Sequence, residues 1–340
     1  MATDKRKSDH IGLTEKAQSD VSLLDTRFDY EPLFGDHKDK SLEFTFLGKK
    51  LGAPLWISSM TGGVNGADQI NATLAKAASH FRLGMGLGSC RPLLKNEKKY
   101  FDQFNVRPIL GEDLPLYANL GIAQIEKLLA QGEGKKIERL VKLLSCDGLI
   151  VHINPLQEWF QPEGDRFQAP PIETLTRLFN ECDLKVIVKE VGQGFGPKSL
   201  HALLEMPLVA IEFAAFGGTN FSKLECLRDQ AEEKKNSSSL CFVGHSTIEM
   251  IDEINRLLPK LEGAGKLRAS KEFIISGGVN SFLDGYHLTS RIDANSCYGQ
   301  ASKMLSGALR GADYLINQIE GELAGLMMAK SFLKVRREKM

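Results

Sequence analysis

Residues 147–191 read DGLIVHINPLQEWFQPEGDRFQAPPIETLTRLFNECDLKVIVKEV. The stretch begins with the apolar run DGLIVHIN (147–154) and ends with KVIVKEV (185–191), and both runs are short and rich in Val and Ile. Between them, IETLTRLFN (172–180) carries apolar residues at helical spacing. Neither run alternates cleanly between apolar and polar residues, which is typical of parallel strands covered on both faces. The stretch therefore predicts one β-α-β unit.

The same alternation of apolar runs and helical segments extends to both sides of this unit. Apolar residues recur at helical spacing in 71–81, 125–131, 137–145 and 199–206. Eight runs are expected to be strands: APLWISS (53–59), LGMGLGS (83–89), LYANL (116–120), DGLIVHIN (147–154), KVIVKEV (185–191), PLVAIEF (207–213), EFIISGG (272–278) and ANSCYG (294–299). Eight such units predict an α/β fold of the (β/α)₈ TIM-barrel type. A doubly wound open sheet is the alternative, because the Gly-rich turn SSMTGG (58–63) follows the first strand.

Three segments are expected to lie outside the barrel of this single domain, 1–340. The connection from Phe213 to Glu272 is oversized, so we interpret 221–271 as an insertion between strands six and seven. Within it, LCFVG (240–244) could be a ninth strand, which would exceed the number that a (β/α)₈ barrel holds. The other two segments are an N-terminal arm, 1–40, and a basic tail, 334–340.

The overall composition excludes several classes of protein. Lys and Arg together number 43, as do Asp and Glu, so there is no bulk positive charge to hold a nucleic acid. No apolar stretch reaches the ~18 residues of a membrane-spanning helix. The polar N-terminus lacks the apolar region of a signal peptide, and none of the six cysteines forms a C-x-x-C pair. We therefore expect reduced thiols and a cytoplasmic protein without membrane or nucleic-acid partners.

Polar groups collect where the expected strands end, which is the face where barrels carry their active sites. Two Gly-Gly turns, at 217–218 and 277–278, would let backbone N–H groups approach an anion. Lys189 lies in an apolar strand and would need an anion or an acceptor there. Together these features predict a phosphorylated cofactor or substrate at this face.

The segment HINPLQEWFQPEGDRF (152–167) is the most informative one for chemistry. His152 and Asn154 point the same way from a strand end, and Gln157 and Glu158 follow in the loop. A single carboxylate among neutral neighbours fits Mg²⁺ that is held by one Glu together with substrate phosphates and waters. The basic N-terminal run KRK (5–7) is either solvated or folds over the mouth to clamp a diphosphate.

Together the motifs resemble type II isopentenyl diphosphate isomerase, a family of FMN-dependent enzymes. The matching pieces occur in the family's order, from residue 5 to about residue 305, and the HINPLQE…QPEGD segment is highly specific. The pieces are KRKSDHI (5–11), SSMTGG (58–63), GLGSCRP (86–92), ANLG (118–121), HINPLQEWFQPEGD (152–165), VKEVGQGFG (188–196), FGGTNFSKLE (216–225) and SGGV (276–279). The sequence departs from the family pattern at Cys90, Phe221 and Asn280, where Gln, Trp and Arg or Gln are common.

The resemblance implies a TIM barrel that isomerises isopentenyl diphosphate to dimethylallyl diphosphate in isoprenoid biosynthesis. It implies reduced FMN and Mg²⁺ as cofactors, NADPH as the reductant of FMN, and a homotetramer or homo-octamer. The FMN contacts carried over by motif are Ser59, Met60, Thr61, Ser89, Asn119, Lys189 and Thr219, with Gly277, Gly278, Ala301 and Ser302 on the phosphate side. The substrate residues are Arg6, Lys7, Arg91, His152, Asn154 and Gln157. Glu158 would hold Mg²⁺, and Gln157, with Glu225 as the runner-up proton carrier, would act in catalysis.

Three other functions stay open at this point. An FMN-dependent 2-hydroxy acid oxidase on the same barrel would use His287 and Arg291, although the expected His-Gly-Gly context is absent. A nucleotide dehydrogenase would use Cys90 as a nucleophile, whereas our interpretation of Cys90 is a buried thiol. The third alternative is a barrel that binds phosphorylated ligands without turnover.

Overall fold

The computed structural model describes residues 2–38, 40–59, 63, 65–228, 236–267 and 271–336. Eight parallel strands form a closed barrel in chain order, with the last strand paired to the first. They are β4 (Leu55–Ile57), β5 (Gly84–Gly86), β6 (Leu116–Gly121), β7 (Gly148–His152), β8 (Val186–Lys189), β9 (Ala210–Glu212), β10 (Glu272–Ser276) and β11 (Ser296–Gln300). The predicted (β/α)₈ TIM barrel is confirmed, and the doubly wound alternative is wrong.

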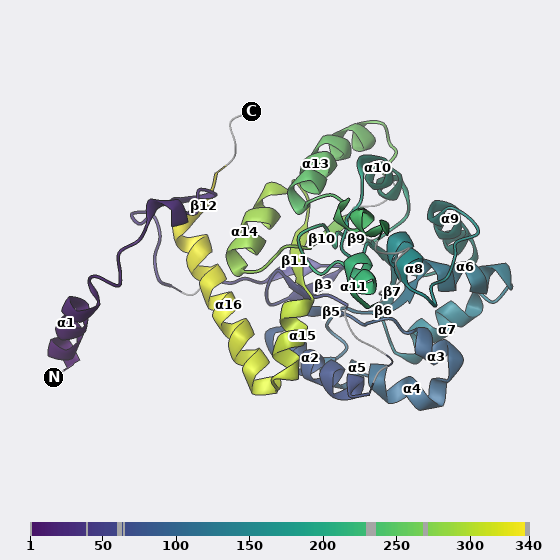
Figure 1. Cartoon of the computed structure of the whole chain (residues 1–340), viewed down its shortest axis with the longest axis horizontal. Helices are drawn as coiled ribbons and strands as arrows, with labels where there is room; N and C mark the ends of the chain where they lie inside the picture. The colour runs from purple at the N-terminus through teal and green to yellow at the C-terminus, as the bar shows by residue number, and fades with distance from the viewer. Residues whose placement is uncertain are drawn as a thin grey trace.

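Helices surround the barrel (Figure 1). Nearly every residue of the eight barrel strands is buried. The helices that follow the first four strands are α2 (Ala67–Phe81), α3 (Arg91–Lys95), α4 (Glu97–Phe104), α5 (Arg107–Leu110), α6 (Ile122–Ala130), α7 (Lys135–Leu143), α8 (Pro155–Phe160) and α9 (Pro171–Glu181). Those that follow the last four are α10 (Pro197–Glu205), α11 (Phe221–Arg228), α13 (Thr247–Gly263), α14 (Phe282–Arg291), α15 (Ser302–Leu309) and α16 (Ala312–Phe332). Within the described part of the chain, none of the helices combines the length and the apolarity needed to cross a membrane.

A hairpin closes the amino-terminal end of the barrel. Its strands are β2 (Phe44–Phe46) and β3 (Lys49–Leu51), which pair antiparallel. The backbone N–H of Leu47 at its turn donates to the carboxylate of Glu272, the first residue of β10. Phe46 is fully buried and packs its ring edge-on against Trp56 of β4, with 6.2 Å between the ring centroids. A hydrophobic plug therefore fills this end, and the opposite, carboxyl-terminal end carries the polar side chains.

The segment 221–271, interpreted as an insertion, contains one helix of the regular barrel. Helix α13 packs beside α10 and α14, and it begins with a capping box between Ser246 and Glu249. The added parts are α11 and a short 3₁₀ helix, η2 (Ser238–Phe242). The expectation that LCFVG (240–244) is no ninth barrel strand agrees with the structure, because η2 covers most of that stretch.

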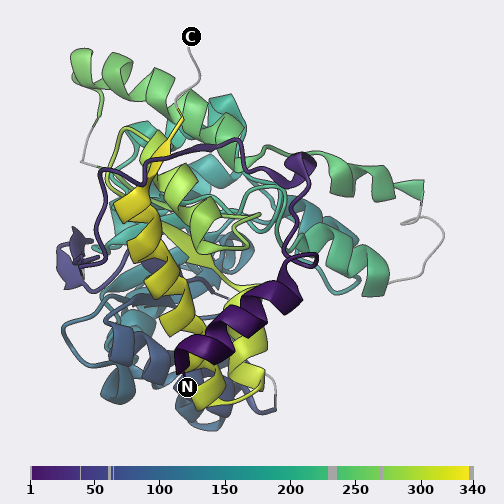
Figure 2. The same cartoon turned by 90° about the vertical axis from the view of Figure 1, so that its left-hand side faces the viewer.

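The N-terminal arm reaches back to the C-terminal end of the chain. Its strand β1 (Phe28–Tyr30) pairs antiparallel with β12 (Leu333–Val335), so part of the predicted basic tail belongs to a strand. Before β1, the arm holds a 3₁₀ helix, η1 (Val21–Leu23), and the exposed helix α1 (Ala2–Leu13). In Figures 1 and 2, α1 lies apart from the barrel, beyond α16.

Candidate active site

The carboxyl-terminal ends of three neighbouring strands bring one layer of polar side chains together. His152, Lys189 and Glu212 are ladder partners across β7, β8 and β9, so they lie at the same height in the barrel. Lys189 is 6% exposed and its Nζ donates to the carbonyl oxygen of Glu190 at 2.8 Å. Above this layer lies a cavity of about 380 Å³, which is in the size range of ligand pockets.

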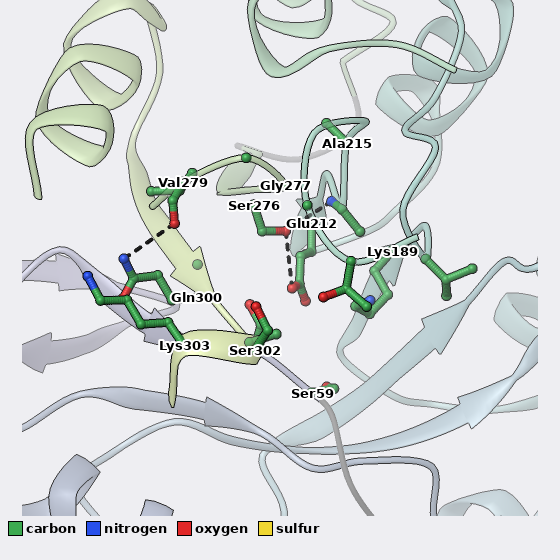
Figure 3. A pocket seen from close by; sticks show the side chains of 18 of the residues that line it. Ser59, Lys189, Glu212, Ala215, Ser276, Gly277, Val279, Gln300, Ser302 and Lys303 are labelled. Carbon is green, nitrogen blue, oxygen red and sulfur yellow. Dashed lines mark hydrogen bonds between the residues drawn. The ribbon is translucent and has the colours of Figure 1, made fainter. Parts of the chain in front are cut away.

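Four buried polar atoms of this cavity have no hydrogen-bond partner within the described protein. They are Ser58 Oγ, Ser59 Oγ, Glu212 Oε2 and Gln300 Oε1. Buried polar groups are rarely left unsatisfied, so such a cluster indicates a polar ligand. Figure 3 shows Lys189 and Glu212 on one side of the cavity, and Gln300 and Lys303 on the other. These lining residues therefore suit a polar ligand.

Gly277 and Gly278 form a turn that no other residue type fits well. Both have positive φ, +97° and +75°, and a Cβ at Gly277 would collide with the backbone of Ala215. The turn lines the cavity together with Ala301 and Ser302, which stand at the start of α15. Backbone N–H groups at a glycine turn and at a helix N-terminus are the usual partners of a phosphate.

A smaller cavity of about 110 Å³ adjoins the first and shares Ser59, Lys189, Val191 and Phe221 with it. Its other lining residues are Gly88, Ser89, Asn119, His152 and Gln157. The Nδ1 atom of His152 lies 2.7 Å from Asn119 Oδ1, which fixes the ring against the wall. Burial, with the charge of Lys189 as the smaller cause, lowers the pKa of His152 to about 3. The ring is therefore a neutral hydrogen-bonding group at physiological pH.

The loop after β7 holds a network around Glu158, which is 4% exposed. Asn154 Nδ2 donates to Glu158 Oε1 and to Gln157 Oε1, each at 3.0 Å. The backbone N–H of Asp165 donates to Glu158 Oε2 at 2.6 Å. Among the described residues, no three His, Cys, Asp or Glu side chains gather to hold a metal ion. Glu158 is a buried carboxylate, and each of its two oxygens accepts a hydrogen bond from the loop.

The structure brings most predicted site residues together. Nine of the eleven predicted FMN residues line the two cavities: Ser59, Ser89, Asn119, Lys189, Thr219, Gly277, Gly278, Ala301 and Ser302. The other two, Met60 and Thr61, lie outside the described residues. Of the predicted substrate residues, His152 and Gln157 line the smaller cavity, and Asn154 contacts Gln157 directly.

Six predicted residues are absent from the described walls of both cavities, and two of them, Asn154 and Glu158, lie in the hydrogen-bond network that includes Gln157. Arg6 and Lys7 are exposed on α1, and the single chain does not bring them to the barrel mouth. Arg91 forms an ion pair with Asp165 at 3.2 Å. Glu225 is buried in α11, where its carboxylate pairs with Arg228 Nε at 2.7 Å. The predicted roles of all the site residues stay predictions.

Sequence reasoning missed two buried residues of the larger cavity. Glu212 is 1% exposed, and its Oε1 accepts a hydrogen bond from Ser276 Oγ at 3.3 Å. Gln300 is 3% exposed and ends β11. Both are the last residues of apolar strands, and that position is the signal that could have identified them.

The structure argues against two of the alternative functions. Burial raises the pKa of the Cys90 thiol to about 12, so Cys90 is an inert thiol instead of a nucleophile. His287 lies in α14, outside the strand ring, and packs edge-on against Phe28 at 5.9 Å. Arg291 of the same helix pairs with Asp252 at 3.3 Å. These side chains are therefore no part of the layer at the strand ends.

Solved structures of flavoenzymes share the fold at low sequence identity. A mandelate oxidase variant with a monooxide FMN adduct aligns with a TM-score of 0.55 and 12% identity, over 91% of this chain and 88% of its own. Flavocytochrome b2 with sulfite bound aligns with a TM-score of 0.56 and 14% identity, over 90% of this chain and 72% of its own. At this level of identity the likeness concerns the fold alone.

Sequence relatives identify the family, although no protein-family profile matches the chain. An isopentenyl-diphosphate delta-isomerase of Nostoc sp. is 35% identical over 291 residues, which cover 83% of this chain and 78% of the relative. A protein of the same name from Rickettsia africae is 34% identical over 325 residues, which cover 93% and 89%. The resemblance seen in the motifs is thereby confirmed, and the chain belongs to the isopentenyl-diphosphate delta-isomerase family.

Proposed function

We propose that the chain interconverts isopentenyl diphosphate and dimethylallyl diphosphate with reduced FMN and Mg²⁺. The observation that carries this proposal is the larger cavity, where partnerless buried atoms of Ser58, Ser59, Glu212 and Gln300 face a glycine turn. The hydrocarbon part of isopentenyl diphosphate could not form hydrogen bonds with these polar atoms of the cavity wall. A flavin, which carries polar ring atoms and a phosphate, would satisfy them.

The two ends of the larger cavity suit the two ends of FMN. Gly277, Gly278 and the start of α15, at Ala301 and Ser302, would hold the phosphate through backbone N–H groups. At the other end, Lys189 offers a buried positive charge, and a flavin ring system offers acceptors for it. Ser59, Ser89, Asn119 and Thr219 line the remaining walls.

The reaction adds a proton at the alkene terminus and removes one from C2, with no net redox change. Bound reduced FMN would supply the acid–base chemistry, with NADPH only as its reductant. Gln157 is neither an ordinary acid nor an ordinary base, so its role would be to orient the substrate. The structure does not bring Glu225, the runner-up proton carrier, to either cavity.

The smaller cavity and its loop would hold the substrate. Gln157 lines the smaller cavity, so its side-chain amide would donate to the diphosphate, and Glu158 would share Mg²⁺ with the diphosphate oxygens and waters. His152 faces Asn119 Oδ1, and Asn154 donates to Gln157 and Glu158, so these two residues would hold the wall and the loop in place around the substrate. Phe221 and Val191 supply the apolar surface that the hydrocarbon part requires. Exclusion of water by these side chains would protect the proton-transfer step.

The experiment that tests these assignments compares two glutamines at opposite ends of α8. Gln157→Ala should lower kcat by about tenfold or more while FMN affinity stays unchanged, because Gln157 lines the smaller cavity. Gln161→Ala, at the C-terminal cap of α8, should keep wild-type turnover. Turnover is followed anaerobically with isopentenyl diphosphate, and FMN affinity by fluorescence titration. Near-normal turnover of Gln157→Ala would remove this residue from the mechanism.

A further inference from the structure

Two thiols meet where α11 packs against η2. The Sγ atoms of Cys226 in α11 and Cys241 in η2 lie 3.2 Å apart, although the residues are 15 positions apart in the chain. Cys226 is half-buried, so a small reagent can reach it, whereas Cys241 is 2% exposed. A disulfide has an S–S length of about 2.05 Å, so the two sulfurs need to approach by only about 1 Å to form one.

Hydrogen bonds join the two elements that carry these thiols. Asn220 Nδ2, just before α11, donates to the carbonyl oxygen of Cys241 at 2.8 Å. Gln193 Nε2 donates to the carbonyl oxygen of Leu240 at 3.1 Å, and its Oε1 accepts from Ser222 Oγ at 2.7 Å. These hydrogen bonds therefore hold together the two elements that carry the cysteines.

One of these two elements, α11, contributes to the site wall through its first residue. Phe221, the first residue of α11, lines both cavities, and Thr219 lies two residues before it in the larger one. Cys226 follows Glu225, the buried carboxylate of α11. A covalent link to η2 would thus restrain α11, which contributes Phe221 to the wall that the two cavities share.

We propose that Cys226 and Cys241 form a reversible disulfide that restrains α11 and slows turnover. The inference rests on the proposed function for its effect on activity, but not for the formation of the bond. Regulatory disulfides in reducing compartments are transient ones between nearby thiols, at least one of which is accessible. The half-buried Cys226 is the attacking thiol and the buried Cys241 is the resolving thiol.

The step balances with a small-molecule disulfide such as oxidised glutathione as the oxidant. The Cys226 thiolate attacks one glutathione sulfur, so that a mixed disulfide forms and one glutathione thiolate leaves. The Cys241 thiolate then attacks the Cys226 sulfur and releases the second glutathione. The two protein thiols give up two electrons and two protons, and one oxidised glutathione becomes two reduced molecules.

The first arm of the test detects the bond itself. The full-length protein, loaded with FMN, is incubated anaerobically with oxidised glutathione and digested without reduction for mass spectrometry. Wild type and the control Cys182→Ser should yield a peptide pair linked through Cys226 and Cys241, lighter by two hydrogens and released by dithiothreitol. Cys226→Ser and Cys241→Ala should yield none. Absence of the linked pair from the wild-type digest would overturn the proposal, whatever the enzyme's activity.

The second arm measures the consequence of the bond. In oxidised wild type, kcat/KM for isopentenyl diphosphate should fall about tenfold, because a restrained wall adjusts poorly to the substrate, and dithiothreitol should restore it. Cys226→Ser should keep the rate of the reduced wild type with or without oxidised glutathione. An equal loss in Cys226→Ser, or no loss in cross-linked wild type, would contradict the regulatory role. A reduced protein without isomerase activity would instead count against the proposed function.

Discussion

Lys189 ends β8 with a side chain that is 6% exposed, and a buried ammonium group needs an anion or an acceptor. The carbonyl oxygen of Glu190 satisfies one of its donors, and the others face both cavities. Lys189→Met should weaken FMN binding about tenfold, because the charge is lost while the apolar stem stays. Flavin fluorescence quenching measures the affinity.

The matched control is Lys185, which directly precedes the first residue of β8. Lys185→Met removes an exposed lysine just before β8, far from the cavities, and should leave FMN affinity unchanged. Equal weakening in both variants would mean that the effect comes from net charge. Unchanged affinity in Lys189→Met would remove this lysine from the flavin site.

His152 makes stability depend on pH, since burial lowers the pKa of its ring from 6.5 to about 3. Between pH 6.5 and about pH 3, His152 binds a proton in the unfolded chain but not in the folded one. The free energy of unfolding therefore decreases as the pH falls through this interval. His152→Gln has no such proton to gain. Between pH 7 and pH 5, wild type should lose about 1 kcal/mol more of its unfolding free energy than His152→Gln does.

Urea unfolding at the two pH values measures this difference. The figure of about 1 kcal/mol is lower than the full pKa shift would give, because the ring stands at a cavity wall and is only partly shielded from water. Equal losses in the two proteins would show that the ring is protonated in the fold. A larger loss in His152→Gln would contradict the sign of the argument.

Single residues were predictable where their chemistry conflicts with their surroundings. Lys189 stands out in an apolar strand, and Gly277 with Gly278 form an obvious turn. Glu212 and Gln300 did not stand out, because each is a final polar residue that also suits an ordinary strand end. Only the closed barrel shows that all of these side chains face one cavity.

The turn after β10 shows how an element's backbone shapes the site. Gly277→Ala should cost about 3 kcal/mol of stability and most FMN affinity, because its Cβ meets the backbone of Ala215. Gly311→Ala is the control, since Gly311 has a similar φ of +109° but open space around it. It should cost about 1 kcal/mol and leave FMN binding intact. Urea denaturation and flavin titration separate these effects, and equal costs would refute the steric argument.

The loop after β7 carries two acids with different environments. Glu158 is buried in the Asn154 network, whereas Glu163 is exposed and pairs with Arg228 at 2.7 Å. Glu158→Gln should raise the Mg²⁺ concentration for half-maximal turnover about tenfold, because a neutral amide is a poorer ligand. Glu163→Gln should not change it. Turnover measured over a magnesium titration decides the point, and an unchanged requirement in Glu158→Gln would refute the ligand assignment.

Elements with strong apolar patterns were predictable, and the connection after β9 was less so. The apolar letters of LCFVG (240–244) suit a strand, but β9 already pairs with β8 and β10. With no strand edge left to join, the stretch forms η2, and Phe242 and Val243 stay 64% and 63% exposed. Whether a segment joins the sheet depends on a free strand edge in the whole barrel, and the local sequence pattern does not contain that information.

At the scale of the whole molecule, the N-terminal arm exposes more apolar surface than a lone chain would need. Val21, Leu33 and Phe34 are 84%, 88% and 79% exposed. The resemblance predicted a homotetramer or homo-octamer, and burial of such side chains between subunits would stabilise it. Multi-angle light scattering should report four or eight subunits per particle, and a monomer at micromolar concentration would contradict this prediction.

The most direct test of the account is an anaerobic assay of the purified protein with FMN, Mg²⁺ and isopentenyl diphosphate. One sample is reduced with dithionite and the other is left oxidised, and dimethylallyl diphosphate is measured in both. Product should form in the reduced sample only. A flavin-bound protein that gives no product in either sample, and that consumes oxygen with a 2-hydroxy acid, would contradict the proposed function.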